Sequence, residues 1–305
     1  MNAVSLIATL FSVLLPAKMW FAPTQPLTIN VQGEGEIELV LTDFLGQAKE
    51  GKNATVKAGS QVDVRQVFHE LSSTGTYVLY AVPKGKKLPE FIGTPIVIGV
   101  RSSNKPGAPT DPMVIKMEPL RYAQMTTDQG PITMIFYYDV APNTVATILG
   151  LAEQGFYEGL TFHRIRPGFV IQGGDPHGDG VGGPGFNIDA EFNDRKHEEG
   201  VLSMARSGDP LEQQGLRPRC EYANSAGSQF FICLEAKAFL DGKYTAFGKV
   251  ASGMDTVKKI AALPVLKNQV ERPETPPVIQ KVEVLPVRVD QNPYAQMFNF
   301  TAPPK

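Results

Sequence analysis

The sequence predicts a mainly β protein of two domains, and three observations support this prediction. The chain has 305 residues, which is about twice the length of an ordinary single domain. Short runs of β-branched and aromatic residues alternate with clusters of glycine, proline and asparagine, a pattern typical of strands joined by tight turns. Only two segments repeat apolar residues at helical spacing. The hydrophobic fraction of 42% is ordinary for a globular protein with a buried core.

The charge and the cysteine content exclude some classes of protein. The formal net charge is -2, so the composition gives no general basic signal and we expect no nucleic-acid partner. The two cysteines, Cys220 and Cys233, are too few for a disulfide framework. One bridge between them is possible. Two free thiols are favoured, because Cys233 falls in an apolar strand and would be buried.

The N-terminus raises a question of targeting. Residues 3–15 form an apolar run whose length suits the core of a signal peptide and is too short to cross a bilayer, which needs about 20 apolar residues. A positive segment before the run is missing, and Ala17 and Ala22 are the candidate cleavage positions. We interpret residues 1–23 as a possible signal peptide, which favours export to the periplasm or cell envelope. The alternative is a buried structural segment in a cytoplasmic protein, and no other stretch predicts a membrane span.

The first domain is predicted over residues 24–118 as a small all-β, sandwich-like unit, because short strands follow one another with regular turn signals. The predicted strands are residues 35–42, 76–82, 95–100 and 113–117. No catalytic pattern occurs here. His69 stands alone beside Glu70 and is interpreted as a surface or hydrogen-bonded histidine, so the partner of this domain stays unknown.

The second domain is predicted over residues 119–287. Residues 130–138 read as a strand, and a helix follows over 142–154, with proline in its first turn and Gly155 just past its end. Apolar residues share one face of this helix, as expected where a helix lies on a core. They are Val145, Ile148, Leu149 and Ala152. A second helix is predicted from Met254, a closing strand over 278–284, and a tail over 288–305.

Three sequence blocks of the second domain carry the functional information. Residues 162–175 place Arg164 five positions before Phe169 and eight before Gln172, in a stretch predicted as strand, turn and strand. Residues 227–232 and 239–243 supply further aromatic and polar side chains. These blocks, in this order, resemble the cyclophilins, the peptidyl-prolyl cis-trans isomerases. The resemblance covers roughly residues 121–287 and implies an eight-stranded antiparallel barrel capped by two helices.

The resemblance also implies roles for individual residues. Arg164 would donate a hydrogen bond to the prolyl nitrogen, and Gln172 would hold Arg164, with Phe169 beside them in an apolar pocket for the proline ring. The implied substrate-binding residues are Val170, Ala205, Arg206, Gln229, Phe231, Phe239, Leu240 and Tyr244. Rotation about a peptide bond makes and breaks no covalent bond, so the activity requires no metal and no cofactor. The implied partners are proline-containing peptides and proteins.

The chain departs from the common family pattern at several positions. Val170 stands where methionine is common, and Arg206 where asparagine is common, which is tolerable if only the main chain binds there. Phe239 and Tyr244 stand where human-type members carry tryptophan and histidine. That tryptophan N–H holds cyclosporin, so weak cyclosporin binding is expected. An insert over residues 206–226 should lie beside the active groove, either contacting substrates or as an idle surface loop.

Other motifs in the chain are interpreted as structural. Residues 178–183 match GxGxxG, but no strand–helix context surrounds them, so we expect a turn-rich loop. Asp175, His177 and Asp179 alternate as metal ligands do, yet the closing glutamate of a calcium loop is missing. His163 should point away from Arg164 on the opposite strand face. The sequence supports no Ser–His–Asp pairing.

The favoured hypothesis is therefore a prolyl isomerase that accelerates rotation about X-Pro bonds in protein substrates and assists their folding. A proline-directed binding or chaperone module with little turnover is the alternative, because several pocket positions depart from the family. In a third hypothesis the first domain carries the main function, as an adhesion or scaffold unit.

Overall fold

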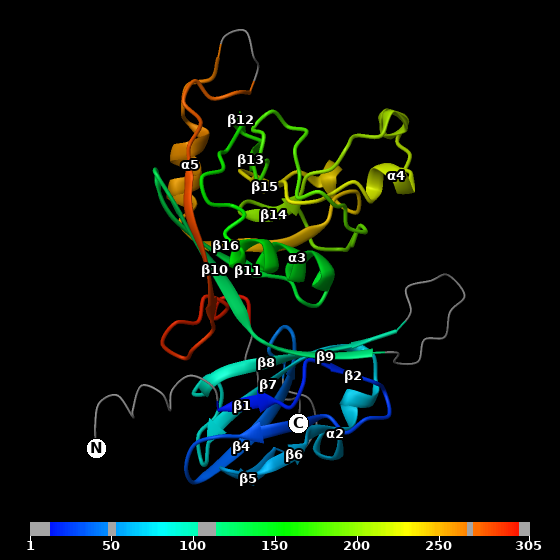
Figure 1. Cartoon of the computed structure of the whole chain (residues 1–305), viewed down its shortest axis with the longest axis vertical. Coiled ribbons are helices and arrows are strands. Elements are labelled where there is room, and N and C mark those ends of the chain that lie inside the picture. Colours follow the sequence, from blue (N-terminus) through cyan, green and yellow to red (C-terminus); the bar gives the residue numbers. More distant parts are fainter. Residues whose placement is uncertain (1–12, 48–52, 103–113, 267–270, 299–305) are drawn as a thin grey trace. The chain divides into compact units, whose positions relative to one another are not determined.

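The computed structural model describes residues 13–47, 53–102, 114–266 and 271–298. The chain divides into two compact units (Figure 1). The first unit contains Met1–Arg121 together with Pro286–Lys305, and the second is Tyr122–Leu285. Each unit is built around its own antiparallel sheet system, so the mainly β fold class is confirmed.

The first unit contains two antiparallel sheets. The larger sheet has the strand order β2-β9-β8-β7-β4-β5 and the smaller one the order β1-β3-β6. The strands of the larger sheet are β2 (Trp20–Phe21), β4 (Glu36–Asp43), β5 (Ala54–Lys57), β7 (Gly75–Pro83), β8 (Ile92–Arg101) and β9 (Val114–Pro119). Those of the smaller sheet are β1 (Leu14–Pro16), β3 (Thr28–Val31) and β6 (Gln61–Asp63). Two single-turn helices, α2 (Val64–Val67) and η1 (His69–Ser72), follow β6.

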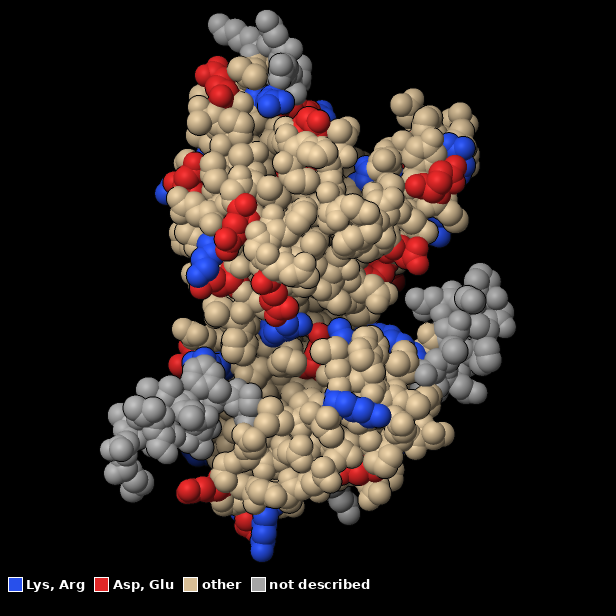
Figure 2. Space-filling model, viewed as in Figure 1, with Lys and Arg blue, Asp and Glu red and all other residues tan. Residues whose placement is uncertain are grey.

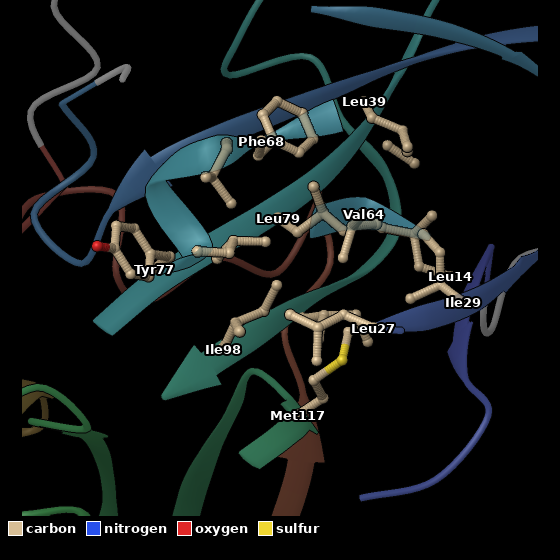
Figure 3. Close-up of a cluster of buried hydrophobic side chains, with 14 of the residues drawn as sticks. Leu14, Leu27, Ile29, Leu39, Val64, Phe68, Tyr77, Leu79, Ile98 and Met117 are labelled. Atoms are coloured by element: carbon tan, nitrogen blue, oxygen red, sulfur yellow. The ribbon is translucent and has the colours of Figure 1, made fainter. Parts of the chain in front are cut away.

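A hydrophobic core fills the space between these two sheets. Residues two apart on a strand share a face, and Leu39 and Leu41 of β4 accordingly join Ile96 and Ile98 of β8 in one cluster of buried side chains. Ile29 of the smaller sheet packs into the same cluster. Figure 3 shows side chains from both sheets meeting in this core. The sandwich-like architecture is therefore present.

The end of the apolar N-terminal run is part of this core. Val13 and Leu14 are buried, and β1 pairs with β3 through the register Leu14↔Val31. Removal of the chain up to Ala17 or Ala22 would delete β1 or both β1 and β2. Most of the predicted signal peptide, residues 1–12, lies outside the described residues.

The C-terminal segment belongs to the first unit and docks on it as far as residue 298. The backbone N–H of Val287 donates to Leu120 O at 3.0 Å, and the Tyr294 hydroxyl donates to Arg121 O at 2.8 Å. The rings of Tyr294 and Phe298 are buried and both pack edge-on against Phe44. The part played by Tyr294 was not predicted, because the aromatic residues of this segment are separated by polar residues and show no regular period.

The second unit is an eight-stranded antiparallel barrel with the strand order β12-β13-β15-β14-β16-β11-β10-β17. Its strands are β10 (Arg121–Thr127), β11 (Gly130–Phe136), β12 (Arg164–Arg166), β13 (Val170–Gly173), β14 (Val201–Met204), β15 (Phe230–Cys233), β16 (Ala246–Ser252) and β17 (Ile279–Pro286). Thr161, just before β12, bridges to Val278, just before β17. This bridge joins the two ends of the sheet and closes the barrel.

Two helices pack on the barrel, as the sequence predicts (Figure 1). Helix α3 (Pro142–Glu153) buries its predicted apolar face, including Val145 and Leu149. The Glu191 carboxylate accepts hydrogen bonds from the first-turn N–H groups of Asn143 and Thr144 at 3.0 and 2.8 Å, which suits the positive end of the helix dipole. Helix α5 (Met254–Ala261) buries Val257 and Ile260.

The surface carries charges of both signs. On the face that Figure 2 shows, basic and acidic side chains are interspersed, in keeping with the net charge of -2. None of the helices in the described parts of the chain has the length and apolar character needed to cross a bilayer.

Candidate active site

The hairpin of β12 and β13 brings the candidate catalytic residues together. Arg164 pairs with Gln172 across the hairpin, and Gln172 pairs with Phe231 of the next strand. Directly opposed residues of antiparallel strands project to the same face, so these side chains form one row. Gly168 allows the turn between the strands, since its φ is +67° and a residue without Cβ adopts such values at little cost.

A chain of hydrogen bonds fixes this row. Arg164 Nη1 donates to Gln172 Oε1 at 3.0 Å, and Gln172 Nε2 donates to Gln229 Oε1 at 2.9 Å. Gln229 Nε2 in turn donates to Gly182 O at 2.8 Å. The buried side chain of Gln229 thus fixes the orientation of the Gln172 amide. Gln172 in turn restricts the position of the Arg164 guanidinium.

Apolar side chains form the floor of a cavity of about 550 Å³ in front of Arg164. Val170, Phe231 and Leu240 are buried in one small cluster, with Phe169 and Tyr244 packed against it. Phe239, on the single-turn helix η3 (Ala238–Leu240), stacks on the Phe169 ring at a centroid distance of 5.7 Å. Phe239 is 62% exposed and forms the rim of this cavity.

The cavity collects the site residues that the sequence singles out. Ten of them line it, namely Arg164, Phe169, Val170, Gln172, Ala205, Arg206, Phe231, Phe239, Leu240 and Tyr244. Gln229 lines a neighbouring groove that shares Gln172 and Ala205 with the cavity. The Ala205 N–H is already bonded to Gln229 O at 2.9 Å, so the main-chain groups left for a peptide here are the Ala205 carbonyl and the Arg206 N–H.

The side chain of Arg206 anchors the insert and is almost completely buried. Its two terminal nitrogens bind the Glu212 carboxylate at 3.0 and 2.7 Å, and its guanidinium lies 4.3 Å from the centroid of the Tyr244 ring. Asp209 caps the single-turn helix η2 (Pro210–Gln214) and binds Arg219, which holds the pKa of that carboxyl far below its usual range. The insert is therefore an ordered wall, and its Ser207 and Ser225 line the neighbouring groove.

A Ser–His–Asp chain is present, contrary to the sequence prediction. His197 Nδ1 lies 3.0 Å from Asp241 Oδ1, and His197 Nε2 lies 3.0 Å from Ser203 Oγ. Ser203 is fully buried and also donates to Thr245 O at 3.0 Å. No substrate can reach a hydroxyl in this position, so this hydrogen-bonded chain fastens the loop residues His197 and Asp241 to strand β14. Sequence spacing missed it because Asp241 lies 44 residues from His197.

The remaining motifs behave largely as structural elements. Asp175 accepts hydrogen bonds from the N–H groups of His177, Asp179 and Gly180, so it shapes the turn-rich loop that follows β13. Asp175, His177 and Asp179 place possible ligand atoms within 4.8 Å of one another, but the Asp175 carboxylate is already committed to that loop. Cys220 and Cys233 are free thiols.

Two residues of the cavity escaped the sequence analysis. Glu271 contacts Arg164 across 107 positions of sequence, at 2.5 Å between Oε2 and Nε, and no local pattern marks it. His163 lines the same cavity as Arg164, contrary to the prediction of opposite strand faces, because β12 begins only at Arg164. Both ring nitrogens of His163 are buried and have no hydrogen-bond partner among the described residues.

Because His163 and His197 are buried, we expect the folded protein to lose stability in mild acid. Burial lowers the pKa of His163, and the nearby carboxylate of Asp175 partly offsets this effect. Burial also lowers the pKa of His197, and Asp241 partly offsets that effect. At pH values between the lowered pKa of the folded state and the ordinary histidine pKa of about 6.5, the unfolded chain binds more protons than the folded chain. The free energy of unfolding therefore decreases as the pH falls through this window. Each histidine removes about 1.4 kcal/mol per pH unit in that window.

Urea unfolding at pH 8, 7, 6 and 5 tests this prediction. We expect the unfolding free energy to be constant at the upper end and to decrease below about pH 6.5, with a smaller decrease in a His163→Gln variant. A stability that is constant or rises between pH 6.5 and 5 would contradict the assignment of neutral buried rings.

Comparison with known proteins agrees with the fold of the second unit. The family model described as cyclophilin type peptidyl-prolyl cis-trans isomerase matches residues 122–284. A peptidyl-prolyl cis-trans isomerase of Synechococcus elongatus is 48% identical over 127 residues, which is 42% of this chain and 78% of that protein. Peptidyl-prolyl cis-trans isomerase B of Bacillus subtilis is 45% identical over 142 residues, 46% of this chain and 90% of that protein.

A solved structure also matches. The crystal structure of a cyclophilin type isomerase from Cryptosporidium parvum has 29% sequence identity and a TM-score of 0.48, and the match covers 55% of this chain and 98% of that one. The residues that the family model matches include the whole barrel core and every residue that lines the cavity beside Arg164. The chain belongs to the cyclophilin-type peptidyl-prolyl cis-trans isomerase family. Both segments of the first unit, Met1–Arg121 and Pro286–Lys305, lie outside the matched residues.

Proposed function

We propose that this chain accelerates rotation about X-Pro bonds in protein substrates and thereby assists their folding. The observation that carries the proposal is the position of Arg164, which lines a cavity with an apolar floor while Gln172 and Glu271 hold its guanidinium in place. The names of the relatives from Synechococcus elongatus and Bacillus subtilis support the same activity.

The mechanism follows from the chemistry of the amide bond. Its rotational barrier is about 18–20 kcal/mol, because rotation destroys the resonance between nitrogen and carbonyl. At the twisted transition state the prolyl nitrogen regains a lone pair. The Nη groups of Arg164 that bind no other residue in the described parts of the chain offer a fixed cationic donor for that lone pair, above the apolar floor of the cavity. Such a donor stabilises the twisted form more than either planar form, and this difference is what lowers the barrier.

The proline ring would occupy the apolar floor formed by Val170, Phe231 and Leu240. The peptide backbone would bind along Gln172 and the free main-chain groups of Ala205 and Arg206. The ordered insert beside that path supports a role in substrate contact, since Ser207 and Ser225 line the adjoining groove. Arg206 contributes its main chain only, because its side chain is committed to Glu212.

Refolding of a test protein limited by prolyl isomerisation checks the proposed function. Uncatalysed isomerisation takes tens to hundreds of seconds at 25 °C, so the slow phase is easily followed. Catalysis predicts a slow-phase rate that rises in proportion to the concentration of this chain. Saturable binding of the test protein without a faster slow phase would favour the binding or chaperone module instead.

Phe239 supports a proposal of weak cyclosporin binding. Cyclophilins that carry tryptophan at this position use the indole N–H to hold cyclosporin, and a phenyl ring has no such donor. Because Phe239 is exposed at the cavity rim, a Phe239→Trp variant should accept the larger ring. We expect it to bind cyclosporin about tenfold more tightly, the value of one hydrogen bond, in a calorimetric titration. Equal affinity of the variant and the wild type would contradict this assignment.

Export is a separate part of the proposal and is supported by the apolar run over residues 3–15. If a signal peptidase cleaves the chain and β1 is kept, the mature chain must begin before Leu14, because β1 starts there and Leu14 is buried in the core of the first unit. N-terminal sequencing of the envelope fraction checks this. A start at residue 18 or 23 would mean that the first unit forms without β1, or without β1 and β2.

A further inference from the structure

Glu271 makes a two-armed ion pair on the strand that carries Arg164. Its Oε2 lies 2.5 Å from Arg164 Nε, and its Oε1 lies 3.2 Å from Arg166 Nε. The two arginines are two positions apart on β12 and therefore project to one side of the strand. The Glu271 side chain is 20% exposed and lines the cavity itself.

The backbone of Glu271 is held as firmly as its side chain. Its carbonyl accepts a hydrogen bond from Ile165 N at 2.6 Å, on the edge of β12 that does not pair with β13. Just after it, Arg272 O accepts from Leu266 N at 2.8 Å, and Glu274 N donates to Pro264 O at 2.8 Å. These bonds join the turn carrying Glu271 to the segment that follows α5.

Glu271 also adopts a conformation that side chains rarely take. Its φ is +77°, and it is the one residue other than glycine with positive φ among the residues described. L-residues with a Cβ pay a steric cost in this region. Such conformations persist where the surroundings enforce them, and they cluster at functional sites. A glycine would adopt this backbone conformation at less cost, so the presence of a glutamate points to a role for its carboxylate.

The hydrogen bonds of Arg164 show what the carboxylate does. A guanidinium has five N–H groups in a rigid plane. Glu271 takes the Nε group and Gln172 takes one of the Nη1 groups. The remaining Nη groups have no partner in the described parts of the chain. Contacts at two separate nitrogens fix both the position and the plane of the guanidinium.

We infer that Glu271 is a positioning residue that holds Arg164 in its productive orientation through Nε. The inference rests on the proposed function, in which Arg164 is the donor to the prolyl nitrogen. Without the carboxylate the arginine would keep its charge but sample other rotamers, and the repulsion between Arg164 and Arg166 would be uncompensated. Because Glu271 engages Nε, it leaves Nη groups available to the substrate and does not block the site.

Two variants with one matched control test the inference. Glu271→Gln removes the charge with little change in shape, and Glu271→Gly removes the side chain while favouring the observed φ, so the fold is preserved. Glu274→Gln makes the same charge change on an exposed residue three positions away. We expect kcat to fall by about ten- to a hundredfold in both Glu271 variants, with KM unchanged. The control should match the wild type.

Two further readouts separate positioning from a general structural role. The Arg164 Nε–H resonance should move upfield in Glu271→Gln, as its bond to a carboxylate is lost, and stay in place in Glu274→Gln. In an Arg164→Lys background the Glu271→Gln change should cause no additional loss of turnover. Unchanged or increased turnover in Glu271→Gln, or an equal loss in both backgrounds, would overturn the inference.

The failure of the proposed function would look different. If the wild-type chain did not accelerate exchange, the assignment of activity would be wrong. The Nε–H resonance would still decide whether Glu271 orients Arg164, since that readout does not depend on turnover.

Discussion

Replacement of Arg164 by alanine is expected to lower kcat/KM by about a hundred- to a thousandfold, the range seen when an enzyme loses one pre-organised donor to its transition state. The loss should fall mainly on kcat, because the donor acts on the twisted amide and contributes little to binding of the planar forms. Arg164→Lys should recover little of the activity, since a flexible ammonium group cannot reproduce a planar fork held at two nitrogens.

Arg166→Ala is the matched control for this experiment. Arg166 lies on the same strand, contacts the same carboxylate at 3.2 Å and is absent from the cavity lining. We expect its effect on kcat/KM to be much smaller than that of Arg164→Ala. Circular dichroism and thermal unfolding should show both variants folded. Comparable losses in the two variants would mean that general charge, and not a specific donor, carries the effect.

Deletion of residues 288–305 is expected to destabilise the first unit while leaving the isomerase domain active. The deletion removes the buried rings of Tyr294 and Phe298, which pack on Phe44. Loss of one buried aromatic side chain typically costs about 3–5 kcal/mol, which is a large part of the stability of a small domain. The cavity residues all belong to the second unit, so turnover should persist.

Trp20 makes this prediction simple to measure. It is the single tryptophan of the chain and lies in β2 of the first unit, so its fluorescence reports the unfolding of that unit alone. We expect the urea midpoint of the Trp20 signal to fall sharply in the deletion variant. Tyr294→Phe, which keeps the ring and removes the hydroxyl that donates to Arg121 O, should cost about 1 kcal/mol. An unchanged Trp20 midpoint after deletion would contradict the docking of this segment.

Local sequence patterns predicted the local structure well. Helix α3 follows directly from Pro142 in its first turn and from the spacing of Val145 and Leu149, because helical period and end signals are encoded within a few residues. The row of candidate catalytic residues could be located because Arg164 and Gln172 lie within one hairpin, where the strand register places them opposite each other. The closed barrel itself came from family resemblance, since alternation along a strand does not specify which strands pair.

Contacts between residues far apart in the sequence were not predicted, because local patterns do not specify which distant segments pack together. Glu271 reaches Arg164 only through the turn that follows α5, and Tyr294 reaches Arg121 only after the chain has traversed the whole second unit. The Asp241–His197–Ser203 chain likewise depends on the packing of separate segments. Leu14 shows a different limit, because an apolar run suits both a signal peptide and a buried strand until its pairing with Val31 is known.

The central claim is that the cavity in front of Arg164 catalyses prolyl rotation. NMR exchange spectroscopy on a short Ala-Pro-Phe peptide, with and without the wild-type chain, tests it most directly. The account predicts cis–trans exchange peaks that appear only with the protein and that disappear when Arg164 is replaced by alanine. Peptide resonances that shift on binding, with no exchange between cis and trans forms, would contradict it.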